Sequence, residues 1–221
     1  MDNQDQLKKQ KVIAYIDGFN LFYSSLKGTK YKWLDIWSMC SALLLPNQKL
    51  VAVKYFSAQI GAAYSNPGKP FRQKIYLEVL QTNPKIEVKL GYFSTHTVKM
   101  PKADDFKNGK ITLVEVIKNE EKGTDVNLAV QMAVDAIKNE FDYAMLFSND
   151  SDMAYAVQIA SQECKKKVGL YIDRKAVTFK ELRKNVSYIR SITPKILASH
   201  QFPNEIKISD ERIIKKPKEW Y

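Results

Sequence analysis

The sequence predicts an α/β fold, in which a mostly parallel central sheet carries helices on both faces. Short apolar runs typical of buried strands alternate along the chain with segments of helical spacing. Because parallel strands are joined by helical crossovers, this alternation favours one three-layer domain. The chain has 221 residues, 45% hydrophobic and 27% charged, which is enough for a large core without disulfides or metal.

The first half of the chain supplies three predicted strands and two helices. Lys11–Asp17 is an apolar run that ends in a carboxylate and a glycine, as a buried strand does. Trp33–Leu45 has helical spacing and is closed by a proline, and Leu50–Gln59 is again strand-like. After a loop rich in turn residues, Arg72–Gln81 is helical and Ile86–Phe93 alternates as a strand.

The second half continues the alternation. A polar stretch at 99–110 predicts a loop, and Ile111–Ile117 predicts an edge strand. Thr124–Lys138 is the clearest helix, because its apolar residues recur on one face and it is rich in alanine. By the same criteria, the remaining strands are Tyr143–Phe147, Val168–Ile172 and Tyr188–Ile192, and the remaining helices are Asp152–Lys165 and Phe179–Asn185.

We expect three parts along the chain: a polar N-terminal segment at 1–10, one domain at 11–200 and a polar C-terminal extension at 201–221. No apolar run approaches the ~18 residues that cross a bilayer, and the N-terminal sequence lacks the form of a signal peptide. The two cysteines, Cys40 and Cys164, are far apart and not in a metal-binding spacing. These features predict a cytoplasmic protein with no membrane partner.

The net charge of +11 favours a polyanionic partner, and nucleic acid is the commonest polyanion in a cell. Lys69 and Arg72 follow the second strand, and Arg174 follows the strand Val168–Ile172, so we expect them to contact phosphate. An exposed turn before a helix is the alternative for the first two. Of the aromatic residues Phe19, Phe22 and Tyr23, we expect at least two in the core and at most one to stack on a base.

Carboxylates occur where predicted strands end or helices begin. Asp17 closes the first strand, Asp125 opens the long central helix, and Asp150 and Asp152 follow the strand Tyr143–Phe147. Taken singly, each can be a helix cap or a turn residue. In a parallel sheet, however, all of them project from the same edge, where ligands bind.

Carboxylates crowded at one edge repel one another unless a cation neutralises them. An oxygen-only site suits Mg²⁺ or Mn²⁺, which activates water and polarises phosphoryl oxygens in phosphodiester hydrolysis. Asp135 lies about 15 Å further along the same helix as Asp125, so we expect a structural role for it. Phosphatases with an aspartyl nucleophile need a second aspartate at the position of Phe19, which disfavours that chemistry.

The ordered motifs D-G-F-N at 17–20, K-G-T-D at 122–125 and S-N-D-S-D at 148–152 resemble those of the NYN domain, a branch of the PIN-like nuclease superfamily. The resemblance covers about Val12 to Ile192. The third motif of the family usually reads S-G-D-S-D-F, whereas this chain has Asn149 and Met153. Neither change removes a carboxylate.

The resemblance implies a PIN-like, Rossmann-like three-layer domain and a metal-dependent nuclease that acts on RNA, with single-stranded DNA as the alternative substrate. It implies that Asp17, Asp125, Asp150 and Asp152 are both the metal ligands and the catalytic residues. The motif residues Asn20, Lys122 and Ser148 are expected to support the site or to contact substrate; for Lys122 a solvated lysine is an equal alternative.

A second hypothesis is that the protein retains the fold but is a nucleic-acid-binding or partner-binding module with weak or no catalytic activity. Retention of all four aspartates argues against it, because a binding module could lose them freely. The sequence leaves open whether two copies pair as a homodimer.

Overall fold

In a computed structural model, which describes residues 9–61, 66–173 and 180–221, the chain forms a seven-stranded sheet in the order β4-β3-β2-β1-β5-β6-β7. All neighbouring strands are parallel except β3 and β4, which are antiparallel. The strands are β1 (Gln10–Asp17), β2 (Gln48–Ala58), β3 (Ile86–Pro101), β4 (Leu113–Lys122), β5 (Tyr143–Phe147), β6 (Lys167–Asp173) and β7 (Tyr188–Ile192). The predicted α/β class is therefore confirmed.

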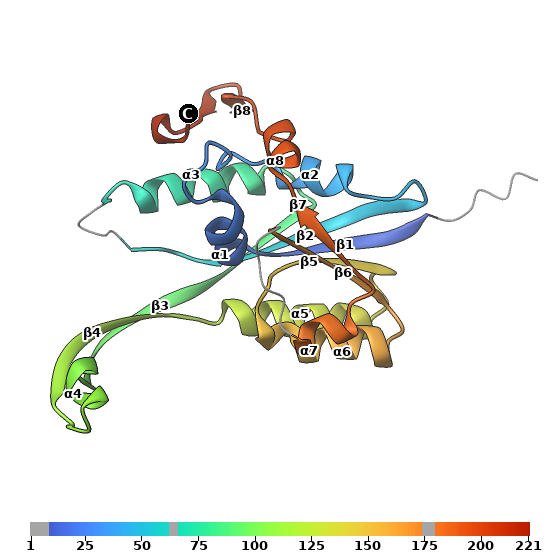
Figure 1. Ribbon diagram of the computed structural model, residues 1–221. Helices are drawn as coiled ribbons and strands as arrows, with labels where there is room; N and C mark the ends of the chain where they lie inside the picture. The colour runs from blue at the N-terminus through green and yellow to red at the C-terminus, as the bar shows by residue number, and fades with distance from the viewer. Residues whose placement is uncertain (1–8, 62–65, 174–179) are drawn as a thin grey trace, which may run out of the picture.

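Helices cover both faces of the sheet (Figure 1). One face carries α2 (Ile36–Ala42), α3 (Lys69–Gln81) and α8 (Pro194–Ser199). The other carries α5 (Thr124–Ile137), α6 (Ala154–Gln158) and α7 (Lys180–Asn185). Short turns extend several of these: η1 (Phe22–Leu26) follows α1 (Gly18–Leu21), and η2 (Ser151–Met153) and η3 (Ile159–Glu163) flank α6.

Alternation along β1 shows how two cores form from one strand. Val12, Ala14 and Ile16 face the core beneath α2 and α3, whereas Ile13 and Tyr15 face the core beneath α5 and α6. This is the period-two pattern of a central strand that is buried on both sides.

The segment at 99–110 is not the loop that its polarity predicted. β3 runs to Pro101, a short helix α4 (Ala103–Lys107) follows, and β4 pairs back along β3 from Leu113 to Lys122. Only the first part of β3, Ile86–Gly91, pairs with β2. The remainder of this hairpin, which we call the arm (residues 92–122), projects from the body of the molecule (Figure 1).

The C-terminal segment folds onto the domain. A small hairpin of β8 (Glu205–Ser209) and β9 (Arg212–Lys215) leads to a turn, η4 (Lys218–Trp220). The ring of Trp220 lies 5.9 Å from Trp33 and 6.1 Å from Tyr76. The end of the chain therefore packs against aromatic residues of the main core. No helix in the described part of the chain is long and apolar enough to span a membrane.

Candidate active site

The candidate site lies where the order of the strands reverses. β1 has β2 on one side and β5 on the other, so the chain leaves the carboxyl ends of β1 and β5 in opposite directions. Such a switch point opens a crevice at the strand ends in α/β sheets. A hollow of about 590 Å³ occurs there, and Asp17, Asp125 and Asp150 all line it. We call it the acidic hollow.

Asp17 is the most firmly held of these carboxylates. It ends β1 and caps α1, where its Oδ1 accepts a hydrogen bond of 2.8 Å from the backbone N–H of Asn20. Its Oδ2 accepts one of 3.1 Å from the Ser148 hydroxyl. Burial raises the pKa of Asp17, those hydrogen bonds oppose the rise, and the charge of Asp150 adds to it. Gly18 is needed next to it, because a Cβ there would stand 2.5 Å from the Tyr55 hydroxyl.

Ser148 was expected to support the site or to contact substrate; it is fully buried, and its contacts are with the site carboxylates. Its hydroxyl donates to Asp17, and its oxygen accepts the backbone N–H of Asp150 at 3.2 Å. One side chain therefore links the ends of β1 and β5. Asn20 lines the acidic hollow and, through its backbone, orients Asp17.

Asp125 approaches the same hollow from the first turn of α5. Gly123, with φ of 93°, turns the chain sharply from β4 into that helix. Burial raises the pKa of Asp125 from 3.8 to about 6, and the charges of Asp17 and Asp150 contribute to the rise. Besides burial, carboxylates from separate parts of the chain therefore contribute to the environment of Asp125.

Glu121 and Asn119 also line the hollow, although neither was predicted as a site residue. Glu121 accepts hydrogen bonds from the backbone N–H (3.0 Å) and the hydroxyl of Thr124. These two residues could have been found from β4, because residues two apart in a strand, such as 119 and 121, lie on the same face. They were missed because the strand was predicted to end at Ile117, whereas it continues to Lys122.

Lys122 lies on the opposite face of β4 from Glu121 and does not line the acidic hollow. Its Nζ is 3.0 Å from Glu120, which faces the same way. Two hydrogen-bonded lysines, Lys118 and Lys122, lower the pKa of Glu120 to about 2. Of the two interpretations of Lys122, the structure therefore favours a surface lysine.

Asp150 and Asp152 follow β5 as predicted, but they do not occupy equivalent positions. Asp150 lines the acidic hollow and caps η2 by accepting the backbone N–H of Asp152 at 2.9 Å. Asp152 is exposed and does not line the hollow. It adds only the smallest of the four charge contributions to the raised pKa of Asp125.

Comparison with known proteins decides the family. The sequence model of the NYN domain matches residues 11–193, which is most of the chain. This chain belongs to the NYN family. The predicted membership of the PIN-like nuclease superfamily is thereby confirmed.

Two individual proteins are similar to this NYN domain. The protein 6-hydroxy-3-succinoylpyridine 3-monooxygenase HspA from Pseudomonas putida is 30% identical over 235 aligned positions, covering 94% of this chain and 74% of its own length. A crystal structure of a protein of unknown function, VPA0982 from Vibrio parahaemolyticus, matches with a TM-score of 0.49 at 18% identity, covering 88% of this chain and 98% of that one.

The donor set of the NYN site suits a hard divalent cation. Within the described ranges, no group of three or more His, Cys, Asp or Glu side chains is placed to hold a metal ion. Mg²⁺, however, keeps several waters and needs only one or two protein carboxylates. Asp17, Asp125 and Asp150 on one hollow, with the pKa of Asp17 and Asp125 raised by crowding and burial, fit such an ion.

The predicted phosphate contacts fall in different places. Lys69 begins α3 and lines the acidic hollow, as expected for a residue that contacts phosphate. Arg72, one turn further along, is 9% exposed and pairs with Glu219 at 2.7 Å and with Asn66. It does not line the acidic hollow. Arg174 lies outside the described residues.

The aromatic residues after Asp17 are more accessible than predicted. Phe22 packs against the core, but Phe19 and Tyr23 both line the acidic hollow and Tyr23 is 52% exposed. The expectation that two of the three would be buried in the core was therefore wrong. The Phe19 ring packs instead against Tyr23, with ring centres 6.5 Å apart, and against Phe93 of β3 at 5.9 Å, so it lines the hollow rather than the core.

Asp135 is not part of the hollow. It is buried between α5 and the sheet, where its carboxylate binds Lys54 at 2.7 Å, Tyr15 at 2.6 Å and Gln131 at 2.7 Å. Tyr15 lies on β1 and Lys54 on β2, so these two contacts join α5 to the sheet, whereas Gln131 lies one turn away on α5 itself. The structural role predicted for it agrees with this position.

Proposed function

We propose that this NYN protein is a Mg²⁺- or Mn²⁺-dependent ribonuclease that hydrolyses phosphodiester bonds, with single-stranded DNA as the alternative substrate. The observation that carries the proposal is the convergence of Asp17, Asp125 and Asp150 on one open hollow at the switch point of the sheet. Membership of the NYN family supports the nuclease class, and the net charge of +11 supports a polyanionic substrate.

In this proposal Asp17 and Asp125 would hold the metal ion and Asp150 would complete the site, whereas the exposed Asp152 would act on it only through its charge. When bound, the ion supplies Lewis-acid polarisation of a phosphoryl oxygen and a lowered pKa for water. Asn20 and Ser148 fix the orientation of the Asp17 carboxylate, and Lys69 offers a positive charge to a phosphate at the mouth of the hollow. Both cysteines are free, which supports a cytoplasmic site of action.

The test incubates the full-length protein with end-labelled single-stranded RNA in Mg²⁺, in Mn²⁺ and in chelator. Cleavage is expected only with metal. Asp17→Asn and Asp125→Asn should each lower the rate by about 100-fold or more, because metal-assisted charge stabilisation is worth several kcal/mol. The matched control is Asp104→Asn, which changes an exposed aspartate on the arm. Binding without product under every condition would instead favour the non-catalytic module.

A second candidate activity is the oxygenation of a small aromatic compound. It is supported by the relative named as 6-hydroxy-3-succinoylpyridine 3-monooxygenase, whose alignment covers 94% of this chain. The test measures O₂ consumption with that pyridine compound and an added reductant, in the same preparation that is assayed on RNA. Hydroxylated product with no RNA cleavage would select this candidate over the ribonuclease.

A further inference from the structure

A second hollow adjoins the acidic one and has a different character. It has a volume of about 240 Å³ and lies between α1–η1, β2, α3 and the C-terminal turn η4. We call it the aromatic pocket. The two hollows share Phe19, Tyr23, Ile60 and Lys69 as lining residues, so they are separated by a common wall.

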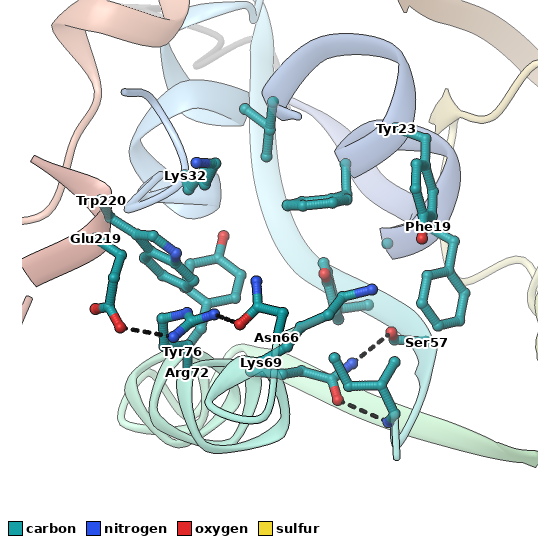
Figure 2. A pocket seen from close by; sticks show the side chains of 16 residues that line it. Phe19, Tyr23, Lys32, Ser57, Asn66, Lys69, Arg72, Tyr76, Glu219 and Trp220 are labelled. Atoms are coloured by element: carbon teal, nitrogen blue, oxygen red, sulfur yellow. Dashed lines mark hydrogen bonds and ion pairs between the residues drawn. The ribbon is translucent and has the colours of Figure 1, made fainter. Parts of the chain in front are cut away.

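The lining of the aromatic pocket combines rings with a few polar groups. Figure 2 shows Phe19 and Tyr23 on one side of it and Tyr76, Glu219 and Trp220 on the other. Sites with mostly apolar walls and a few fixed polar groups are the usual form of a small-ligand pocket. The volume of about 240 Å³ lies below the ~300–1,000 Å³ of sites for drug-sized ligands. The pocket therefore suits a single planar ring system.

Hydrogen bonds make its walls rigid. Gln73 donates to the carbonyl of Ala58 at 2.9 Å and accepts the backbone N–H of Ile60 at 3.0 Å, which ties the end of β2 to α3. On the opposite side, Arg72 holds Glu219 at 2.7 Å (Figure 2). A binding surface fixed in this way loses little entropy when a ligand enters.

Two cations lie beside the Tyr23 ring. The ammonium groups of Lys27 and Lys69 lie 5.0 Å and 5.9 Å from the centre of the Tyr23 ring. Lys69 also lines the acidic hollow, so its positive charge is close to both the hollow and the aromatic pocket. An aromatic ring in the pocket that carries an anionic group beside Lys69 would suit both the rings and this shared positive charge.

We propose that the aromatic pocket binds one unpaired nucleobase of a single-stranded nucleic acid, whose neighbouring phosphate lies at the acidic hollow. The inference rests on the proposed function for its substrate class. A base in a duplex is already stacked and paired, so only an unpaired base can enter. Stacking on aromatic side chains beside a cationic groove is the general mode of single-strand binding.

The proposal also gives the C-terminal segment a role. Glu219 and Trp220 form one wall of the pocket, and Trp220 is held by the rings of Trp33 and Tyr76. Residues far apart in the sequence, α1 at one end and η4 at the other, therefore enclose the same ligand.

The experiment measures binding of a fluorescent single-stranded RNA to the full-length protein in chelator, so that no strand is cut. Tyr23→Ala should weaken binding about 10-fold, within the range for loss of one base–aromatic stack, whereas Tyr23→Phe should bind like the unaltered protein. The matched control is Tyr155→Ala, which removes a 68% exposed ring on α6, on the other side of the sheet. Thermal unfolding checks that each variant is folded.

Two further measurements distinguish the contribution of stacking from that of charge. Tyr23→Ala should leave the salt dependence of binding unchanged, whereas Lys69→Gln should reduce its logarithmic slope by about 0.7, the value for one lost phosphate contact on a single strand. An RNA duplex of the same sequence should bind at least about 10-fold more weakly than the single strand.

Equal binding by Tyr23→Ala and Tyr155→Ala, or equal binding of duplex and single strand, would overturn the proposal. The outcome is separable from that of the nuclease test. Weaker binding by Tyr23→Ala without cleavage in any metal would support the pocket and reject the ribonuclease. Metal-dependent cleavage with unaltered binding by Tyr23→Ala would do the reverse.

Discussion

At the scale of single residues, the pKa of Asp125 links the site to stability. In the metal-free protein the folded state holds a proton on this carboxyl up to about pH 6, whereas an unfolded chain releases it near 3.8. The folded state therefore binds more protons between those values, so the free energy of unfolding falls as pH rises through that window. Asp125→Asn removes this cost. We expect it to stabilise the metal-free protein at pH 7 by about 1 kcal/mol, after allowing for solvent screening.

The measurement is thermal unfolding in chelator at pH 4 to 8, with Asp104→Asn as the exposed control. The difference between Asp125→Asn and the unaltered protein should shrink toward pH 4, where both side chains are neutral. Added Mg²⁺ or Mn²⁺ should raise the melting temperature of the unaltered protein more than that of the variant, because the ion binds the folded carboxylates. A variant less stable than the unaltered protein at pH 7 would contradict the crowding argument.

At the scale of elements, the buried pair of Lys54 and Asp135 fastens α5 to the sheet. Asp135→Ala should destabilise the fold by about 3–5 kcal/mol, because the buried Lys54 ammonium keeps only the more distant Glu87, 4.0 Å away. Replacing both residues, as Lys54→Met with Asp135→Leu, should recover much of that loss because no unpaired charge remains. Denaturant unfolding measures both. If the double variant is as unstable as Asp135→Ala, packing rather than charge explains the effect.

The elements that the sequence predicted well are those with a strong hydrophobic pattern. The bounds of β5 and β7 agree with the prediction, because a short apolar run between polar residues is typical of a buried strand. The site carboxylates Asp17, Asp125 and Asp150 were predicted for the same reason, since each adjoins such an element. Glu121 was missed because the apolar run of the exposed arm stops at Ile117, whereas β4 continues through polar residues to Lys122.

Contacts between distant parts of the chain were also beyond the sequence. The polarity of residues 201–221 predicted an extension, but Trp220 packs on Trp33 and Tyr76. The burial of Arg72 follows from the same contact, because its partner Glu219 belongs to that segment. A local pattern shows what a segment can bury but not which residues far along the chain will cover it.

At the scale of the whole molecule, the arm differs from the rest of the chain in its charge and its exposed apolar side chains. The chain carries +11, yet residues 99–122 hold six basic and five acidic residues. This nearly neutral part of the arm is therefore poorly suited to bind phosphate. It exposes large apolar side chains instead, with exposed fractions of 62% at Phe106, 71% at Ile111 and 77% at Ile117. Exposed apolar surface of this kind is typical of protein interfaces.

We expect a second copy of this chain to cover the arm. The outer face of α5 offers a matching apolar surface, since Val126, Val130 and Ile137 are 66%, 56% and 68% exposed. Reciprocal contact of arm and helix would bury both in a two-fold dimer, the commonest symmetric assembly. Light scattering after gel filtration should give twice the chain mass for the unaltered protein and the single mass for Ile117→Glu. The control Lys118→Glu changes charge next to it and should stay dimeric. A single mass for the unaltered protein at every concentration would reject the dimer.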